Sequence, residues 1–188
     1  MTTSTGTAAT AAPALRRLYF VRFGFALVWA GLLATSASEP GPLSVTLLVL
    51  YPLFDVAAAL VDVRSSRNSA QGSAPTPGLY VNIAVSGLAT AGLAVAAASG
   101  IPAVLRVWGV WAVASGLTQL AVGVSRRALG GQWAMILSGA VSTIAGTTFV
   151  LHAAQPDAAL LDLAGYATLG GVFFLVSAVR LTRSTAAL

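Results

Sequence analysis

The 188-residue chain contains no cysteine and a single histidine. The lack of cysteine excludes disulfide bonds, a thiolate nucleophile and metal sites with cysteine ligands. His152 alone does not make a histidine-rich metal site, and the acidic residues are scattered along the chain. No phosphate-binding glycine loop, aspartate-rich metal motif or catalytic-triad spacing occurs either. The sequence therefore predicts no metal and no other cofactor.

Charge is also scarce. Only 8% of the residues are charged, whereas 57% are hydrophobic and the mean hydropathy is +0.85. A soluble domain usually carries about 25% charged residues, because water must solvate its outside. This chain cannot cover a water-facing surface with so little charge, so lipid must be its main solvent.

The few basic residues are all arginine. Ten arginines and no lysine stand against five acids, which gives a net charge of +5. Nucleic-acid binding would require a basic patch on one face of a domain. Here the arginines lie mostly at the ends of apolar runs, where they orient a membrane protein. We therefore expect a lipid bilayer, and no nucleic acid, as the partner; the sequence indicates no oligomeric state.

Long apolar runs define the expected helices. A helix that crosses the bilayer core needs about 20 mostly apolar residues. Turn-forming segments rich in proline and glycine separate six runs of that length, at 17–36, 43–63, 78–99, 103–124, 130–151 and 159–181. This pattern predicts an all-α, integral membrane six-helix bundle over residues 15–183, built from three helical hairpins. Residues 1–14 are predicted to be a disordered cytoplasmic tail, and 64–77 a flexible cytoplasmic loop.

The arginines also predict the topology, because excess arginine marks the cytoplasmic side. They precede the first run, follow the second and fourth, and end the sixth, as Arg16, Arg17, Arg64, Arg67, Arg126, Arg127, Arg180 and Arg183. We predict a multi-pass protein of the bacterial inner membrane with both termini in the cytoplasm. A cleavable signal peptide ending before Ser38 is the alternative, but Arg22 interrupts its apolar region, which is long enough to span.

The even-numbered runs align without gaps as a weak repeat. An aromatic residue recurs at Tyr51, Trp111 and Tyr166. Small residues recur at helical spacing near the end of the chain, from Gln132-Trp133 through Ser138-Gly139, Gly146, Gly165-Tyr166 and Gly170-Gly171 to Ser177-Ala178-Val179-Arg180-Leu181. These features resemble the short hydrophobic repeat of HdeD-type bacterial membrane proteins. The resemblance implies six helices, an inner-membrane location and a role in acid resistance or envelope stress, with no catalytic motif to carry over.

Asp55 is the main ionisable residue expected within the membrane. A charge near the middle of a span costs about 2.5–3.5 kcal/mol on insertion scales, which suggests a function or a specific partner. At 100° per residue, Tyr51, Asp55 and Asp62 share one face of their helix. Further candidates for a polar pocket or ion pairs lie on the other runs, at Arg22, Asn82, Trp111, Gln119, Gln132 and Tyr166.

Two interpretations of this polar layer remain open. Arg22 could neutralise Asp55 or Asp62 while the amides hydrogen-bond between helices. Alternatively, the layer could form a vestibule open to the cytoplasm. A small-residue series at Ser138, Ser142 and Gly146 is predicted to serve helix packing.

Three functions are compatible with these features. The first is a non-enzymatic, HdeD-like membrane protein. The second is a membrane-embedded enzyme in which Asp55 and Asp62 act as acid and base on a lipid or isoprenoid substrate. The third is a small proton- or cation-linked transporter. The absence of a catalytic motif favours the first.

Overall fold

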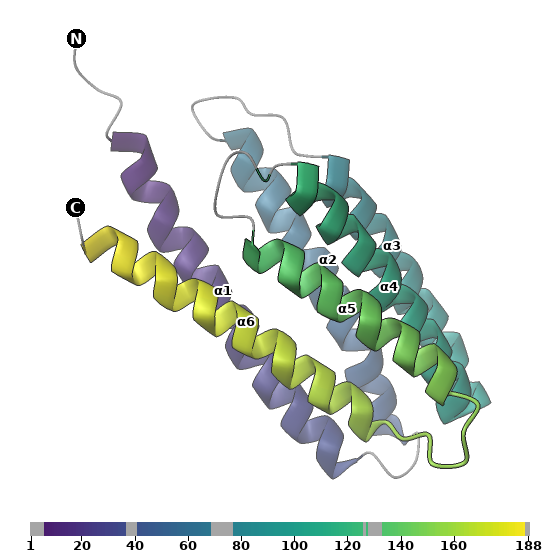
Figure 1. The fold of residues 1–188 in the computed structure, drawn as a ribbon. Coiled ribbons are helices and arrows are strands. Elements are labelled where there is room, and N and C mark those ends of the chain that lie inside the picture. The colour runs from purple at the N-terminus through teal and green to yellow at the C-terminus, as the bar shows by residue number, and fades with distance from the viewer. Residues whose placement is uncertain (1–5, 37–40, 69–76, 126, 128–132, 187–188) are drawn as a thin grey trace. The chain divides into compact units, whose positions relative to one another are not determined.

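The computed structural model describes residues 6–36, 41–68, 77–125, 127 and 133–186. Within these residues the chain is almost wholly helical, which confirms the predicted all-α class (Figure 1). The α-helices are α1 (Gly6–Thr35), α2 (Pro42–Asn68), α3 (Pro77–Ala96), α4 (Ile101–Ser125), α5 (Trp133–His152) and α6 (Leu161–Ala186). A short 3₁₀ turn, η1 (Ala97–Ser99), extends α3.

Two predicted boundaries are wrong. The expected tail at 1–14 is helical from Gly6, because its many alanines have the highest intrinsic helix propensity. The expected loop at 64–77 begins later, because α2 continues through Arg64 to Asn68. Residues 69–76 of that loop lie outside the described residues.

Five of these helices are long and apolar enough to cross a membrane. The candidate spans are Pro42–Val61, Pro77–Ser99, Ile101–Ser125, Met135–His152 and Leu161–Arg180. In α1 the apolar stretch, Tyr19–Thr35, has only 17 residues, at the lower limit for a span. The chain is thus a multi-pass membrane protein, and a sixth span through α1 stays a prediction.

The side chains that point outward agree with a hydrocarbon solvent. Leu88 and Val95 on α3 are 75% and 73% exposed, and Ile144 and Leu151 on α5 are each 68% exposed. Large apolar side chains that stay exposed along whole helices would favour aggregation in water. In lipid, exposed apolar side chains contact hydrocarbon and do not favour aggregation.

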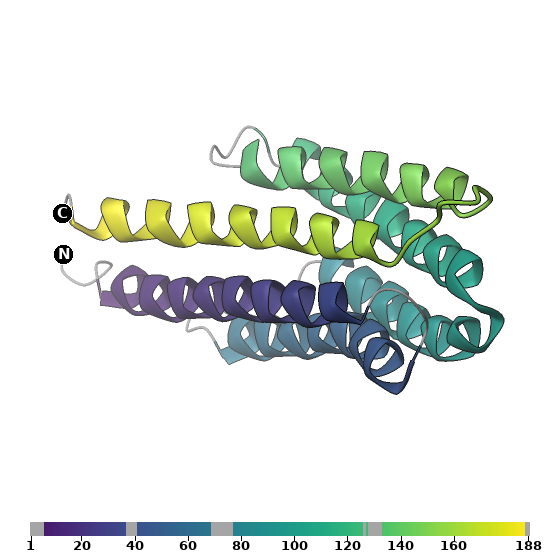
Figure 2. The same ribbon diagram turned by 90° about the horizontal axis from the view of Figure 1, so that it is seen from below.

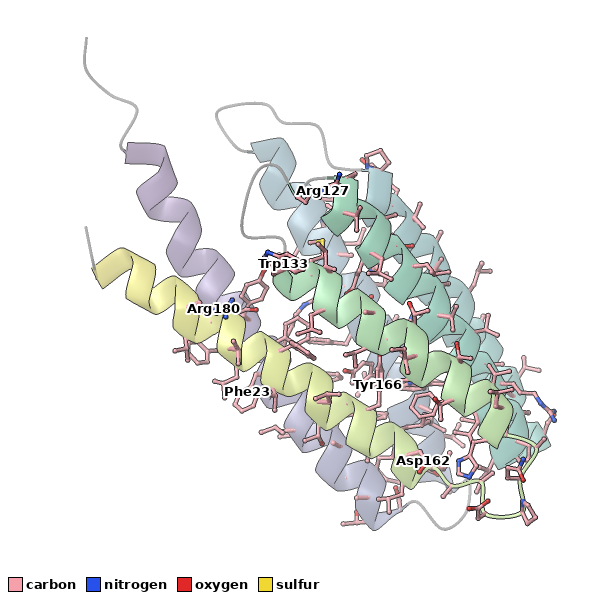
Figure 3. The ribbon with its side chains drawn as sticks, viewed as in Figure 1. Phe23, Arg127, Trp133, Asp162, Tyr166 and Arg180 are labelled. Atoms are coloured by element: carbon pink, nitrogen blue, oxygen red, sulfur yellow. The ribbon has the colours of Figure 1, made fainter. Side chains whose placement is uncertain are left out.

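The chain divides into two compact units. One comprises residues 1–31 and 163–188, and the other residues 32–162. In the first unit, α1 packs against α6 where Gly171 lies beside Phe23 and Ala26 (Figure 3). The ring of Phe174 also contacts Tyr19, with 6.0 Å between the ring centroids.

In the second unit, α2 packs on α3, α3 on α4, and α4 on α5 (Figure 2). The contact between α4 and α5 is especially close because glycines face each other. A Cβ added at Gly109 would lie 2.6 Å from the carbonyl oxygen of Gly146, and one at Gly116 would lie 2.7 Å from that of Gly139. The predicted packing role of Gly146 is confirmed, and Ser142 between these glycines is buried.

The hairpin of α3 and α4 is tight at both ends. Gly100 turns the chain with φ 88°, a left-handed conformation that favours glycine. Near this turn a Cβ at Gly92 would meet Val107 at 3.1 Å, and at the other end a Cβ at Gly78 would meet Val122 at 2.9 Å. Close approach at both ends leaves the middle of the hairpin as the place where the two helices can leave a gap.

Candidate functional site

A hydrogen-bond network surrounds Asp55 in the second unit. The amide nitrogen Nδ2 of Asn82 donates to Oδ2 of Asp55 at 2.7 Å, and the hydroxyl of Ser86 donates to the same oxygen at 2.9 Å. Asn82 and Ser86 lie four residues apart on α3, so they share one face of that helix. The carboxylate of α2 is therefore held by two donors from its neighbouring helix.

Trp111 extends this network to a third helix. Its indole Nε1 donates to Oγ of Ser86 at 3.0 Å. Ser86 is fully buried, and its hydroxyl both accepts from Trp111 and donates to Asp55. The polar chain Trp111–Ser86–Asp55 thus joins α4, α3 and α2.

An aromatic cluster packs beside this chain. The ring centroids of Tyr51 and Trp111 are 6.0 Å apart, and those of Tyr51 and Trp108 are 5.5 Å apart. Trp108 and Trp111 meet edge to face at 5.1 Å. Such geometry is favourable for aromatic pairs and adds about 0.5–1.5 kcal/mol beyond area burial. The three rings thus join α2 to α4.

The network gathers three of the predicted pocket candidates around Asp55, namely Tyr51, Asn82 and Trp111. Sequence reasoning missed Ser86, which connects them. Its position one helical turn after Asn82 was the available signal, because residues at i and i+4 share a face. A serine in an apolar helix does not by itself indicate a polar site.

Each of the other described candidates belongs to one of the two units. Arg22 belongs to the first unit, where its guanidinium lies over the ring of Phe174, 5.1 Å from the centroid. Tyr166 on α6 also belongs to that unit (Figure 3). Pairing of Arg22 with Asp55 and the threefold repeat register therefore stay predictions. Gln119 makes no hydrogen bond within the described part of the chain. Gln132 and the side chain of Asp62 lie outside the described residues.

A second polar cluster lies where α5 ends. Nδ1 of His152 is 2.9 Å from Oδ2 of Asp162, and Nε2 is 3.2 Å from Oδ1 of Asp157. An imidazolium donates from both nitrogens and fits this arrangement, whereas a neutral ring donates from one. The cluster ties the loop and the first turn of α6 to the end of α5. The described residues contain no group of three or more side chains suited to hold a metal ion.

A cleft of about 420 Å³ opens between α3 and α4. Its apolar walls are Val85, Leu88 and Ala89 from α3 with Val107, Val110 and Ala114 from α4. Arg106 and Trp111 complete the lining. Asp55 is not among the residues that line this cleft.

Comparison with protein-family models, curated proteins and solved structures finds no match to this chain. The helices and their exposed apolar faces define a multi-pass α-helical membrane protein, and its function must be inferred from its own residues.

Proposed function

We propose that this chain is a non-enzymatic membrane protein of the HdeD type, located in the bacterial inner membrane and acting in envelope maintenance or stress. The pattern of small residues in the last third of the chain supports the proposed assignment to this family. The hydrogen bonds around the carboxylate of Asp55 support a role without catalysis, in which Asp55 packs α2 against α3.

The contacts of Asp55 carry this proposal. One of its carboxylate oxygens accepts hydrogen bonds from both Asn82 and Ser86. An acid or base catalyst must reach the proton that it transfers, directly or through one water. The described cleft is lined by α3 and α4, so Asp55 on α2 does not contribute to its surface. Hydrogen bonds between helices of this kind contribute to membrane-protein packing.

Replacing Asp55 with leucine tests this assignment. Asp55→Leu removes the acceptor and leaves the donors of Asn82 and Ser86 unsatisfied, at about 1–3 kcal/mol for an unsatisfied group. The folded yield and the Tm in detergent should therefore fall. Gln119→Leu is the matched control, because it also removes a polar side chain from a span and should retain the wild-type Tm. An unchanged Tm for Asp55→Leu would contradict the packing role and favour acid–base chemistry on a lipid or isoprenoid.

The physiological part of the proposal is tested with the same variants. A strain that lacks this gene should survive acid exposure less well than its parent. The wild-type chain and Gln119→Leu should restore survival, whereas Asp55→Leu should fail in proportion to its lost folded protein. Equal survival of the deletion strain and its parent under acid would contradict the stress assignment, whatever the Tm of the variants.

A further inference from the structure

The cleft between α3 and α4 carries a charge at one end only. Arg106 lies five residues after the start of α4, roughly 8 Å along the helix axis at 1.5 Å per residue. Its side chain is exposed and makes no ion pair within the described residues. The remaining lining is apolar except for the indole of Trp111. A cation at the rim of an apolar groove is complementary to a molecule with an anionic head and a hydrocarbon tail.

The position of Arg106 strengthens this interpretation. Most of the other arginines flank the ends of spans predicted to face the cytoplasm, whereas Arg106 lies near the opposite end of α4. An arginine in a span is costly unless it reaches the interface or meets a counter-charge. A lipid headgroup supplies that counter-charge, because arginine pairs with phosphate through charge-assisted hydrogen bonds.

The shape of the cleft follows from its small residues. Ala89 on α3 and Ala114 on α4 leave room for the cleft in this hairpin, which narrows where Gly92 lies beside Val107 and Gly78 beside Val122. Along α4 the lining extends from Arg106 to Ala114, roughly 12 Å by the helical rise. The volume of about 420 Å³ lies within the range of ligand pockets, about 300–1,000 Å³.

We infer that this cleft binds one phospholipid with an anionic headgroup from the surrounding bilayer. Arg106 binds the phosphate or another anionic group of the head. One acyl chain lies between Val85, Leu88 and Ala89 on one side and Val107, Val110 and Ala114 on the other. Trp111 also lines the groove and links it, through its hydrogen bond to Ser86, to the network of Asp55.

Native mass spectrometry of the full chain in detergent tests this site with two probes, dioleoyl phosphatidylglycerol and dioleoyl phosphatidylcholine. The wild type should retain the anionic lipid in preference to the zwitterionic one. Arg106→Gln should weaken binding of phosphatidylglycerol about tenfold, as expected for the loss of a hydrogen bond to a charged group. It should weaken binding of phosphatidylcholine less, because the choline cation of that lipid already offsets the charge of its phosphate.

Arg127→Gln is the matched charge control, because Arg127 follows the other end of α4 and lies outside the cleft (Figure 3). Ala114→Leu fills the groove and should weaken binding of both lipids, whereas Ala121→Leu on the exposed side of α4 should not. Equal effects of Arg106→Gln and Arg127→Gln would overturn the site, as would equal retention of both lipids by the wild type. Since Arg106 is exposed, the charge comparison remains decisive even if Ala114→Leu does not fold.

Discussion

Single side chains in the second unit show how a membrane helix accommodates an acid. Asp55 occupies the middle of α2, where lipid offers no hydrogen-bond donor. Two donors from α3 replace that missing solvation. Ser86 is central because its hydroxyl serves as acceptor for Trp111 and donor for Asp55. Removing the hydroxyl of Ser86 should therefore weaken both its contact with Trp111 and its contact with Asp55.

We expect Ser86→Ala to lower the free energy of unfolding by about 1–2 kcal/mol, because it leaves the indole N–H of Trp111 without its acceptor. Combined with Trp111→Phe, the loss should be less than additive, by about 0.6 kcal/mol. Ser115→Ala is the control. Its buried hydroxyl has no hydrogen-bond partner within the described residues, so its removal should not destabilise the fold. Unfolding monitored by tryptophan fluorescence measures the three single variants Ser86→Ala, Trp111→Phe and Ser115→Ala and the double variant. Equal effects of Ser86→Ala and Ser115→Ala would argue against the network.

The sequence predicted part of this site. Asp55 and Asn82 were found because a charge or an amide within an apolar run is rare and costly. Tyr51 and Trp111 were found because aromatics recur in the aligned runs. Ser86 was not found, because serine is common in membrane helices. Its role becomes visible only when the way in which α2, α3 and α4 face one another is known.

Whole helices depend on the close approach of backbones in the second unit. Gly109, Gly116 and Gly123 follow one another at intervals of seven residues on α4, and Gly139 and Gly146 show the same interval on α5. The first two pair with Gly146 and Gly139 across the interface. Small residues at such positions permit van der Waals contact between helices in lipid, where no hydrophobic force holds them together.

Adding a methyl group at these glycines should separate α4 from α5. We expect Gly116→Ala to destabilise the protein by about 1–3 kcal/mol, the usual cost of overpacking, because its Cβ would meet Thr143 Oγ1 at 2.6 Å and the carbonyl of Gly139 at 2.7 Å. Gly87→Ala on α3 is the control, since nothing lies within 4 Å of its added Cβ. Thermal unfolding in detergent distinguishes them. A Tm for Gly116→Ala as high as that for Gly87→Ala would contradict the close packing.

Helix boundaries were predicted to within a few residues where a turn-forming residue marks them, as at Gly100 between η1 and α4. They were less accurate where polar segments extend a helix beyond the membrane. Arg64 and the residues after it continue α2 to Asn68, because this stretch contains two arginines, which are good helix formers, and neither glycine nor proline. Periodicity did not predict which helices pair, because a helix that is apolar on most sides has no distinctive face.

The whole molecule is defined by its passage through the bilayer. Five helices satisfy the length and apolarity of a span, and the composition of the chain leaves lipid as its solvent. The positions of the arginines predict that both termini lie in the cytoplasm, which requires an even number of crossings. The helix α1 must then cross the membrane as well. Its apolar stretch of 17 residues, Tyr19–Thr35, is just long enough.

Topology mapping tests this central claim most directly. Reporter fusions after Thr35, Arg67, Ser99, Arg127 and Gln155 should alternate between the outside and the cytoplasm, starting outside, and an N-terminal tag should lie in the cytoplasm. Two adjacent fusions on the same side would contradict this alternating topology. An N-terminal tag on the outside would show that α1 does not cross, and a mature chain that begins near Ser38 would show that it is removed; either result would contradict six spans.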